Sequence, residues 1–355
     1  MTSTFAADVP PTPRAGRLAS AALLLSASFV LSRILGLLRN SVIAAVFGNH
    51  GPIESYFAAF RIPDTIFTLV SGGALASAFI PVFAGLVHSH EEDEAWQVTS
   101  SVFNAVCVAL AGLALVAFIF APIIIGLVFG GFSGPRQSMT VDLTRIMLLQ
   151  PIFLGAAAVI SGVLQTYHRF VLTAVAPLIY NVVVIVGALM GHHYGLTGLA
   201  WSVVIGALAQ VLIQLPGVWP DARWTYRFSL NFDSPHVREV MRLFGPRVVG
   251  LAAFQAMLFI TYALASYLPG GMIPAINYSW VLIAFPVGAL GTAAAQAVFP
   301  TLSRLSASED LATVRYTVNR SLRLILFLAL PSAAGLIVLR RPVVNLLYHR
   351  GDFTP

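Results

Sequence analysis

The stretch SYFAAFRIPDTIFTLVSGGALASAFIP, residues 55–81, is long and apolar enough to cross a lipid bilayer as a helix. It nevertheless carries two charged side chains, Arg61 and Asp64, next to Pro63. A charge at the middle of a bilayer costs about 2.5–3.5 kcal/mol on insertion scales, so such residues usually face a bundle interior or a water-filled cavity. The stretch therefore predicts a membrane helix with a functional polar face.

The remainder of the chain has the same character. Of its 355 residues, 58% are hydrophobic and only 10% are charged, whereas an ordinary soluble domain has about 25% charged residues. Apolar runs long enough for a helical span recur along the whole length. The predicted spans are 18–46, 54–87, 97–129, 138–165, 170–191, 195–218, 237–267, 273–303 and 315–339. We therefore expect an all-α, polytopic transmembrane helical bundle.

The basic residues are all arginines, and their placement predicts the orientation in the membrane. The arginine-rich connection 219–247 should be cytoplasmic by the positive-inside rule. If the N-terminus is cytoplasmic too, twelve loop arginines lie inside and four lie outside. The twelve are Arg14, Arg17, Arg169, Arg223, Arg227, Arg238, Arg242, Arg247, Arg304, Arg315, Arg320 and Arg323, and the four are Arg136, Arg340, Arg341 and Arg350. We predict a cytoplasmic tail over residues 1–17 and a cytoplasmic linker over residues 219–236.

Two segments of the chain return about 220 residues later. The matched pairs are ALASAFIPVF (74–83) with AAAQAVFPTL (293–302), and PIIIGLVFGGF (122–132) with PVVNLLYHRGDF (342–353). Six predicted spans separate the copies, and because six is even, both copies cross the membrane in the same direction. This is a parallel repeat, a known plan for transporters. It predicts two lobes of six helices, the first over residues 18–218 and the second, incomplete with three helices, over residues 237–355.

Three arginines lie within the first two predicted spans: Arg33, Arg39 and Arg61. Arg33 is about 15 residues into its span, or roughly 22 Å along the helix axis, which is too deep for easy escape to the surface. Arginine grips phosphate bidentately and does not lose its charge. The cluster predicts a cavity for an anionic, phosphate-bearing substrate. The alternative is that Arg61 pairs with Asp64 near the interface and anchors the helix.

The second span also contains residues that interrupt helices. Pro63 removes a backbone donor, and the pair Gly72-Gly73 loosens the helix again. We therefore expect this span to be bent or partly unwound where it lines a cavity. With Pro81 and its repeat counterpart Pro300, these residues are candidate gating positions.

The sequence lacks the motifs of covalent chemistry. It has no GxxxxGK[ST] phosphate loop, no HExxH and no GxSxG. Its single cysteine, Cys107, allows no intrachain disulfide and no thiol-metal cluster. We expect a transporter that is not an enzyme, with no cofactor, no metal site and no nucleic-acid partner. Its energy must come from an ion gradient, with a monovalent coupling ion as a candidate, from the membrane voltage, or from the substrate's own gradient.

Several segments, in serial order, resemble those of a known family. They are LSRILGLLRNSVIAAVFG (31–48), ESYFAAFRIPD (54–64), GGALASAFIPVF (72–83), GLAWSVVIGALAQVLIQLP (198–216), FPVGALGTAAAQAVFPTLS (285–303), LRLILFLALPSAAGL (322–336) and HRGDF (349–353). From about residue 20 onward, the chain resembles the MurJ/MviN family of lipid II flippases, within the superfamily of multidrug and polysaccharide exporters. Family members usually have fourteen spans, to which this chain would correspond over the first nine.

The resemblance implies export of an undecaprenyl-pyrophosphate-linked disaccharide-pentapeptide across the bacterial cytoplasmic membrane, by alternating access, for cell-wall synthesis. The expected partners are this lipid-linked glycan and the membrane lipids. Arg33, Arg39 and Arg61 match basic family positions that are thought to hold the pyrophosphate, and Glu54 matches an acidic one. With Asp64, these are the candidate substrate-binding residues.

Some positions that are charged in many family members are apolar or neutral here. They are Phe67, Thr68 and Gly72 in the second span, and Trp280, Val281 and Ala284 in the eighth. Half of the expected polar cavity is therefore apolar. Two other functions stay open beside lipid II transport: export of another polyprenyl-linked saccharide, and a non-transporting membrane scaffold of cell-wall assembly.

Overall fold

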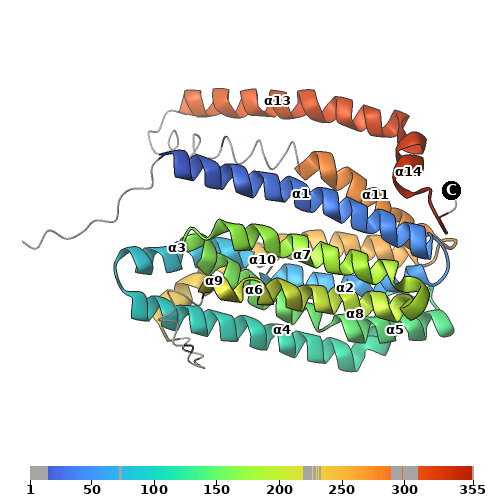
Figure 1. Ribbon diagram of the computed structural model, residues 1–355, viewed down its shortest axis with the longest axis horizontal. Coiled ribbons are helices and arrows are strands. Elements are labelled where there is room, and N and C mark those ends of the chain that lie inside the picture. Colours follow the sequence, from blue (N-terminus) through green and yellow to red (C-terminus); the bar gives the residue numbers. More distant parts are fainter. Residues whose placement is uncertain are drawn as a thin grey trace, which may run out of the picture.

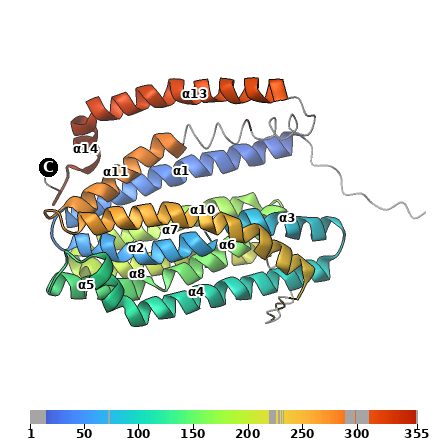
Figure 2. The same cartoon turned by 180° about the vertical axis from the view of Figure 1, so that it is seen from behind.

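The computed structural model describes residues 15–71, 74–218, 233–288 and 311–353, with Tyr226, Ser229, Asn231 and Val298 between these ranges. Within them the regular structure is helical, and the helices form an elongated bundle (Figures 1 and 2). Eight helical segments of the described chain are long and apolar enough to cross a membrane. The predicted all-α, polytopic fold is confirmed.

The region predicted to be the first lobe contains helices α1 to α9. Their bounds are α1 Ala15–Phe47, α2 Ile53–Ser71, α3 Ala74–His88, α4 Glu92–Val128, α5 Pro135–Met147, α6 Gln150–Thr166, α7 Phe170–Leu189, α8 Gly191–Leu212 and α9 Leu215–Val218. The predicted span 138–165 is divided between α5 and α6, because Pro151 lies in the first turn of α6 and cannot donate a hydrogen bond to the turn before it. The two helices still form one candidate membrane crossing, Pro135–Thr166.

The region predicted to be the second lobe contains α10 Pro235–Ala265, α11 Met272–Pro286, α13 Leu311–Val338 and α14 Arg340–Tyr348. The predicted span 273–303 is described only as far as Gly288 and at Val298. The short helix α14 was not predicted. It begins after Leu339, which leaves the helical conformation at the end of α13.

The second span is not unwound at Pro63, and the predicted bend of this span stays a prediction. Helix α2 runs through Pro63 from Ile53 to Ser71, and α3 likewise runs through Pro81. A helix tolerates a proline in a membrane protein when neighbouring groups bond to the freed backbone or pack against it. Gly72, Gly73 and Pro300, the other candidate gating positions, lie outside the described residues.

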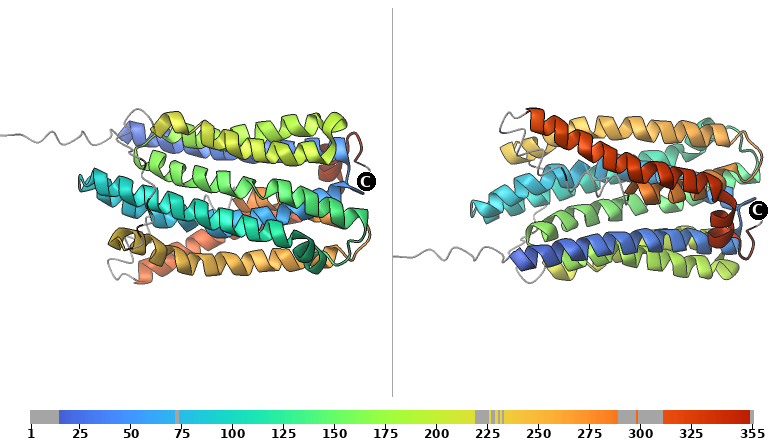
Figure 3. Two further views of the ribbon diagram at one scale, coloured as in Figure 1. Left: turned by 90° about the horizontal axis from the view of Figure 1, so that it is seen from below. Right: turned by 90° about the horizontal axis from the view of Figure 1, so that it is seen from above.

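The helices of the bundle form a larger group, α1 to α10, and a smaller group of α11, α13 and α14. α1 packs along α7, α7 along α8, and α2 against α5 and α6, while α10 packs against α2, α3 and α4. Helices α11, α13 and α14 lie beside α1, on one side of the bundle (Figures 1 and 2). Seen from above in Figure 3, α13 crosses obliquely between α1 and α10.

At one end of the bundle, the turn after α14 lies against α11 and the end of α1. The two predicted lobes also meet where α10 packs against α2, α3 and α4. We call residues 348–353 the hook. Tyr348 and Phe353 are buried and pack on Tyr278 of α11, with ring centroids 4.9 Å and 6.0 Å away. Tyr278 also contacts Phe57 of α2 edge-on at 5.4 Å. Burial raises the pKa of Tyr348, so its hydroxyl stays protonated and donates to the Tyr278 carbonyl.

The backbone of the hook lies directly on the end of α1. The Asp352 N–H donates to the Ala45 carbonyl over 2.9 Å. Gly351 has a φ of +58°, and a Cβ at this position would overlap the Ala45 carbonyl. Only glycine combines this left-handed conformation with such a close backbone approach.

We expect Gly351→Ala to destabilise the protein by more than the roughly 1–2 kcal/mol cost of left-handed backbone alone. The control is Gly51→Ala, because Gly51 has a φ of +75° and no heavy atom within 4 Å of an added Cβ. Thermal unfolding of the two purified variants measures the difference. Equal melting temperatures would contradict the close contact between Gly351 and Ala45.

Candidate functional site: a cationic cavity between the predicted lobes

A cavity of about 870 Å³ lies between α1, α2, α11, α13 and α14. Among the described residues that line it, three are charged: Arg33 and Arg39 of α1, and Asp64 of α2. Two of the arginines singled out from the sequence are therefore brought together at an internal surface. The cavity volume is within the range of small-molecule and cofactor sites in proteins.

The helical spacing of α1 places one face toward the cavity. Arg33, Gly36 and Asn40 recur at intervals of three and four residues and all line it. The Arg39 guanidinium lies 5.9 Å from the centre of the Tyr180 ring on α7. Arg33 reaches toward α11, because its Cζ lies 3.5 Å from the position that a Cβ on Gly288 would take. A larger residue at position 288 would press on the Arg33 guanidinium.

Arg61 lies beside the cavity lining rather than in it. Its Nη1 is 3.4 Å from Asp64 Oδ2, and its Nη2 donates to Gln255 Oε1 on α10 over 2.8 Å. Its guanidinium also lies 5.5 Å from the centre of the Tyr262 ring, on the same helix. The side chain is only 12% exposed. The expectation that Arg61 points into water is therefore not met: the guanidinium is held inside the bundle, and it joins α2 to α10.

Glu54 lies away from the cavity, at the hook end of the bundle. Its side chain is 4% exposed and forms an ion pair with Arg136 of α5. Its other carboxylate oxygen accepts the backbone N–H of Gly271, the residue that caps the N-terminus of α11. One buried carboxylate therefore joins α2, α5 and α11.

The α11 side of the cavity is apolar. Trp280, Val281 and Ala284, where the family resemblance implied charged residues, all line it. These three side chains form part of one wall of the cavity. Phe67 and Thr68 are not among the described lining residues, and Gly72 lies outside the described range.

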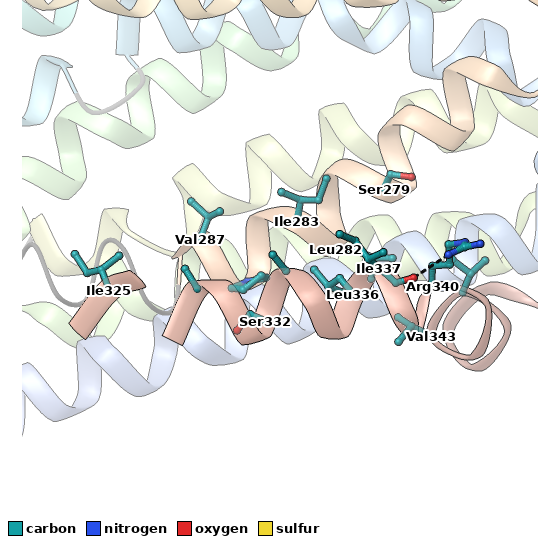
Figure 4. Close-up of a pocket in the computed structure, with 14 residues that line it drawn as sticks. Ser279, Leu282, Ile283, Val287, Ile325, Ser332, Leu336, Ile337, Arg340 and Val343 are labelled. Carbon is teal, nitrogen blue, oxygen red and sulfur yellow. Dashed lines mark hydrogen bonds between the residues drawn. The ribbon is translucent and has the colours of Figure 1, made fainter. Parts of the chain in front are cut away.

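A second pocket, of about 640 Å³, lies between α11, α13 and α14 (Figure 4). It is lined mainly by apolar side chains such as Leu282, Leu336 and Val343. Arg340 is at its edge, but Nη1 of this residue donates to the Ile337 carbonyl over 3.0 Å. The pocket therefore offers little to a phosphate, and the cavity with Arg33 and Arg39 is the candidate site.

Sequence reasoning missed several partners of the site residues. Arg136 entered only the count of loop arginines that predicts the orientation of the chain in the membrane. Tyr180 and Tyr262 carried no prediction. Gln255 did carry a signal, because a polar side chain within an apolar span usually bonds to another helix. Its partner, Arg61, lies in a span far away in the sequence. Neither segment alone predicts the hydrogen bond between them.

A multi-helix membrane bundle with an internal cationic cavity between two helix groups defines a transporter-like protein. Residues 43–355 match the family described as Lipid II flippase MurJ. Because this match covers most of the chain, the chain belongs to the MurJ family, a family of transporters.

Individual relatives agree with this assignment. The lipid II flippase MurJ of Burkholderia cenocepacia is 31% identical over 342 residues, which cover 94% of this chain and 66% of the relative. The probable lipid II flippase MurJ of Rhizobium meliloti is 30% identical over 333 residues, covering 91% of this chain and 62% of the relative. The chain thus spans about two thirds of the length of these relatives.

Solved structures share the fold. A structure titled "Lipid II flippase MurJ, inward closed conformation" superposes with a TM-score of 0.78 at 25% identity, covering 94% of this chain and 68% of the other. An inward-facing multidrug transporter of the MATE family gives a TM-score of 0.72, at 15% identity, covering 94% of this chain and 77% of the other. The second likeness supports the fold alone.

Proposed function

We propose that this chain is the pyrophosphate-binding part of a flippase that moves lipid II across the bacterial cytoplasmic membrane. The observation that carries the proposal is the pair Arg33 and Arg39 in the lining of one open cavity of about 870 Å³ between the helices. Two guanidinium groups in a region of low dielectric constant are suited to a diphosphate, because charge-assisted hydrogen bonds are strongest there. Membership of the MurJ family supports lipid II as the molecule that carries the diphosphate.

The hook end supports transport by alternating access. With a cytoplasmic N-terminus, α1 runs outward and ends at the outer face, where the hook and Glu54 join the two predicted lobes. The described contacts at this end would keep the cavity closed to the outside. Outward release of substrate then requires that Glu54 and the hook give up their contacts across the lobes. In this proposal Glu54 is a gate residue rather than a substrate ligand.

A scaffold without transport activity is less well supported. Such a protein has no need for two arginines facing an internal cavity, since a charge within the membrane is costly to place. Export of a different polyprenyl-linked saccharide would use the same diphosphate site, so the arginines do not distinguish it from lipid II.

The proposal is tested by supplying the full-length gene to a bacterium whose own lipid II flippase is depleted. We expect growth to be restored by the wild-type gene and to be lost with the Arg33→Ala, Arg39→Ala double variant at equal protein level. Growth with the double variant would show that transport does not depend on Arg33 and Arg39. Failure of the wild-type gene at normal expression would argue against lipid II as substrate.

A further inference from the structure

Asp64 is an acidic residue in a cavity that is proposed to bind an anion. Its side chain is 33% exposed, and it is the acidic residue among the described residues that line the cavity. How this carboxylate tolerates a diphosphate in the same cavity is a question that rests on the proposed function.

The groups around Asp64 come from four helices. α1 contributes Arg33 and Arg39, α2 contributes Arg61, α7 contributes Tyr180 against Arg39, and α10 contributes Tyr262 and Gln255 against Arg61. The α11 wall contributes the apolar side chains Trp280, Val281 and Ala284. Among the described lining residues, Asp64 therefore has arginine neighbours and no second carboxylate.

Arg61 is held on the α10 side of Asp64, away from the cavity lining. Its Nη2 is bonded to Gln255 and its face lies against the Tyr262 ring, both on α10. Turning the guanidinium toward the cavity would break these contacts between α2 and α10. Arg61 thus neutralises Asp64 from the side of the bundle interior, and the carboxylate keeps its exposed part toward the cavity.

A diphosphate held by Arg33 and Arg39 would lie in the same cavity as this carboxylate. Two anionic groups that share a site of low dielectric constant favour a proton on one of them. A diphosphate diester is a much stronger acid than a carboxylic acid, so the proton goes to Asp64. The resulting O–H can donate a hydrogen bond to a phosphate oxygen, which turns a repulsive contact into an attractive one.

We propose that Asp64 takes up one proton from cavity water when the diphosphate binds, and returns it to water when the diphosphate leaves. The site therefore binds substrate and proton together. Arg61 keeps its bond to Gln255 in both states, so Asp64 and not Arg61 responds to the substrate.

The test is the pH dependence of binding to a short-chain diprenyl diphosphate, whose two negative charges do not titrate near neutrality. If one proton is taken up, the Kd rises by up to about tenfold per pH unit over the range in which Asp64 is ionised in the free protein and protonated in the complex. Isothermal titration calorimetry in buffers of different ionisation enthalpy counts the same proton. For Asp64→Asn we expect a Kd that changes little with pH and no proton uptake.

Two further variants separate this role from a structural one. Asp64→Glu keeps a titrating carboxylate and should keep the pH dependence. Glu94→Gln removes an exposed carboxylate of α4 that pairs with His236 outside the cavity, and it should behave as the wild type does. Melting temperatures of all variants show whether each protein is folded.

A flat pH profile for the wild type, or an equal slope in the wild type and Asp64→Asn, would overturn the inference. Failure of the diphosphate to bind either protein would refute the diphosphate cavity itself, and the inference with it. Binding that is unchanged in strength and slope in Arg39→Ala would likewise refute the cavity and leave no site for the proton.

Discussion

Replacing Arg39 with alanine is expected to reduce lipid II transport by about tenfold to hundredfold. Arg39 lines the cavity, and its guanidinium is already oriented against the Tyr180 ring before substrate arrives. Loss of one charged hydrogen-bonding group costs about 1.5–3 kcal/mol, which corresponds to this range of affinities. The measurement is the rate of lipid II translocation in vesicles that contain equal amounts of the two proteins.

The matched control is Arg320→Ala, which removes an exposed arginine of α13 that does not line the described cavity. It should transport at close to the wild-type rate. Arg39→Lys is also informative, because lysine keeps the charge but loses the planar, bidentate guanidinium. Full activity of Arg39→Ala would show that the substrate does not use this side of the cavity.

Glu54→Gln is expected to destabilise the hook end by about 2–3 kcal/mol. The substitution keeps an acceptor for the Gly271 N–H, but it leaves the Arg136 guanidinium without its counter-charge. Breaking a buried ion pair on one side is costly because the remaining charge stays desolvated. Arg136 is 32% exposed, so water screens part of its charge and the loss falls below the roughly 3–5 kcal/mol usual for a fully buried pair.

Hydrogen exchange measures this effect at the residues concerned. Backbone amides near Gly271 should exchange faster in Glu54→Gln than in the wild type, and the melting temperature should fall. Glu94→Gln is the control, since Glu94 is 43% exposed and its pair with His236 lies outside the hook end. Exposed pairs contribute only about 0–1 kcal/mol. Equal exchange in both variants would show that Glu54 does not hold the lobes together.

Most of the helical architecture was predictable, because apolar length is a strong signal in a membrane protein. The positions of all the described spans followed from it, including α4, predicted over residues 97–129 and found as Glu92–Val128. Local breaks were less predictable. Pro63 stays within a continuous helix, whereas the span containing Gln150 divides into α5 and α6. Both segments contain proline, and packing around it decides between these outcomes.

The two lobes and their duplication stay a prediction from the sequence. The second copy of the first repeat, residues 293–302, is described only at Val298. Both copies of the second repeat are described, and Phe132 and Phe353, the last residues of the two copies, are buried in the same hydrophobic core.

The candidate site was partly predictable from the cost of charge in a membrane. That argument identified Arg33, Arg39 and Asp64, which do line one cavity. It could not separate them from Arg61, because burial cost is the same whether an arginine faces a cavity or bonds to Gln255 on another helix. Glu54, which was singled out by the family resemblance, lies away from the cavity. Whether a charged side chain faces the cavity or bonds to another helix depends on contacts between segments about 200 residues apart. The sequence of neither segment alone predicts those contacts.

The central claim, that lipid II occupies the cavity beside Arg33 and Arg39, is tested most directly by chemical protection of Val281. This residue lines the opposite, α11 side of the cavity. In a Cys107→Ser background, the Val281→Cys variant should react with a negatively charged methanethiosulfonate, and saturating lipid II should slow the reaction at least about tenfold. The protection should vanish when Arg33 and Arg39 are both replaced by alanine. An equal reaction rate with and without lipid II in the arginine-containing protein would contradict the account.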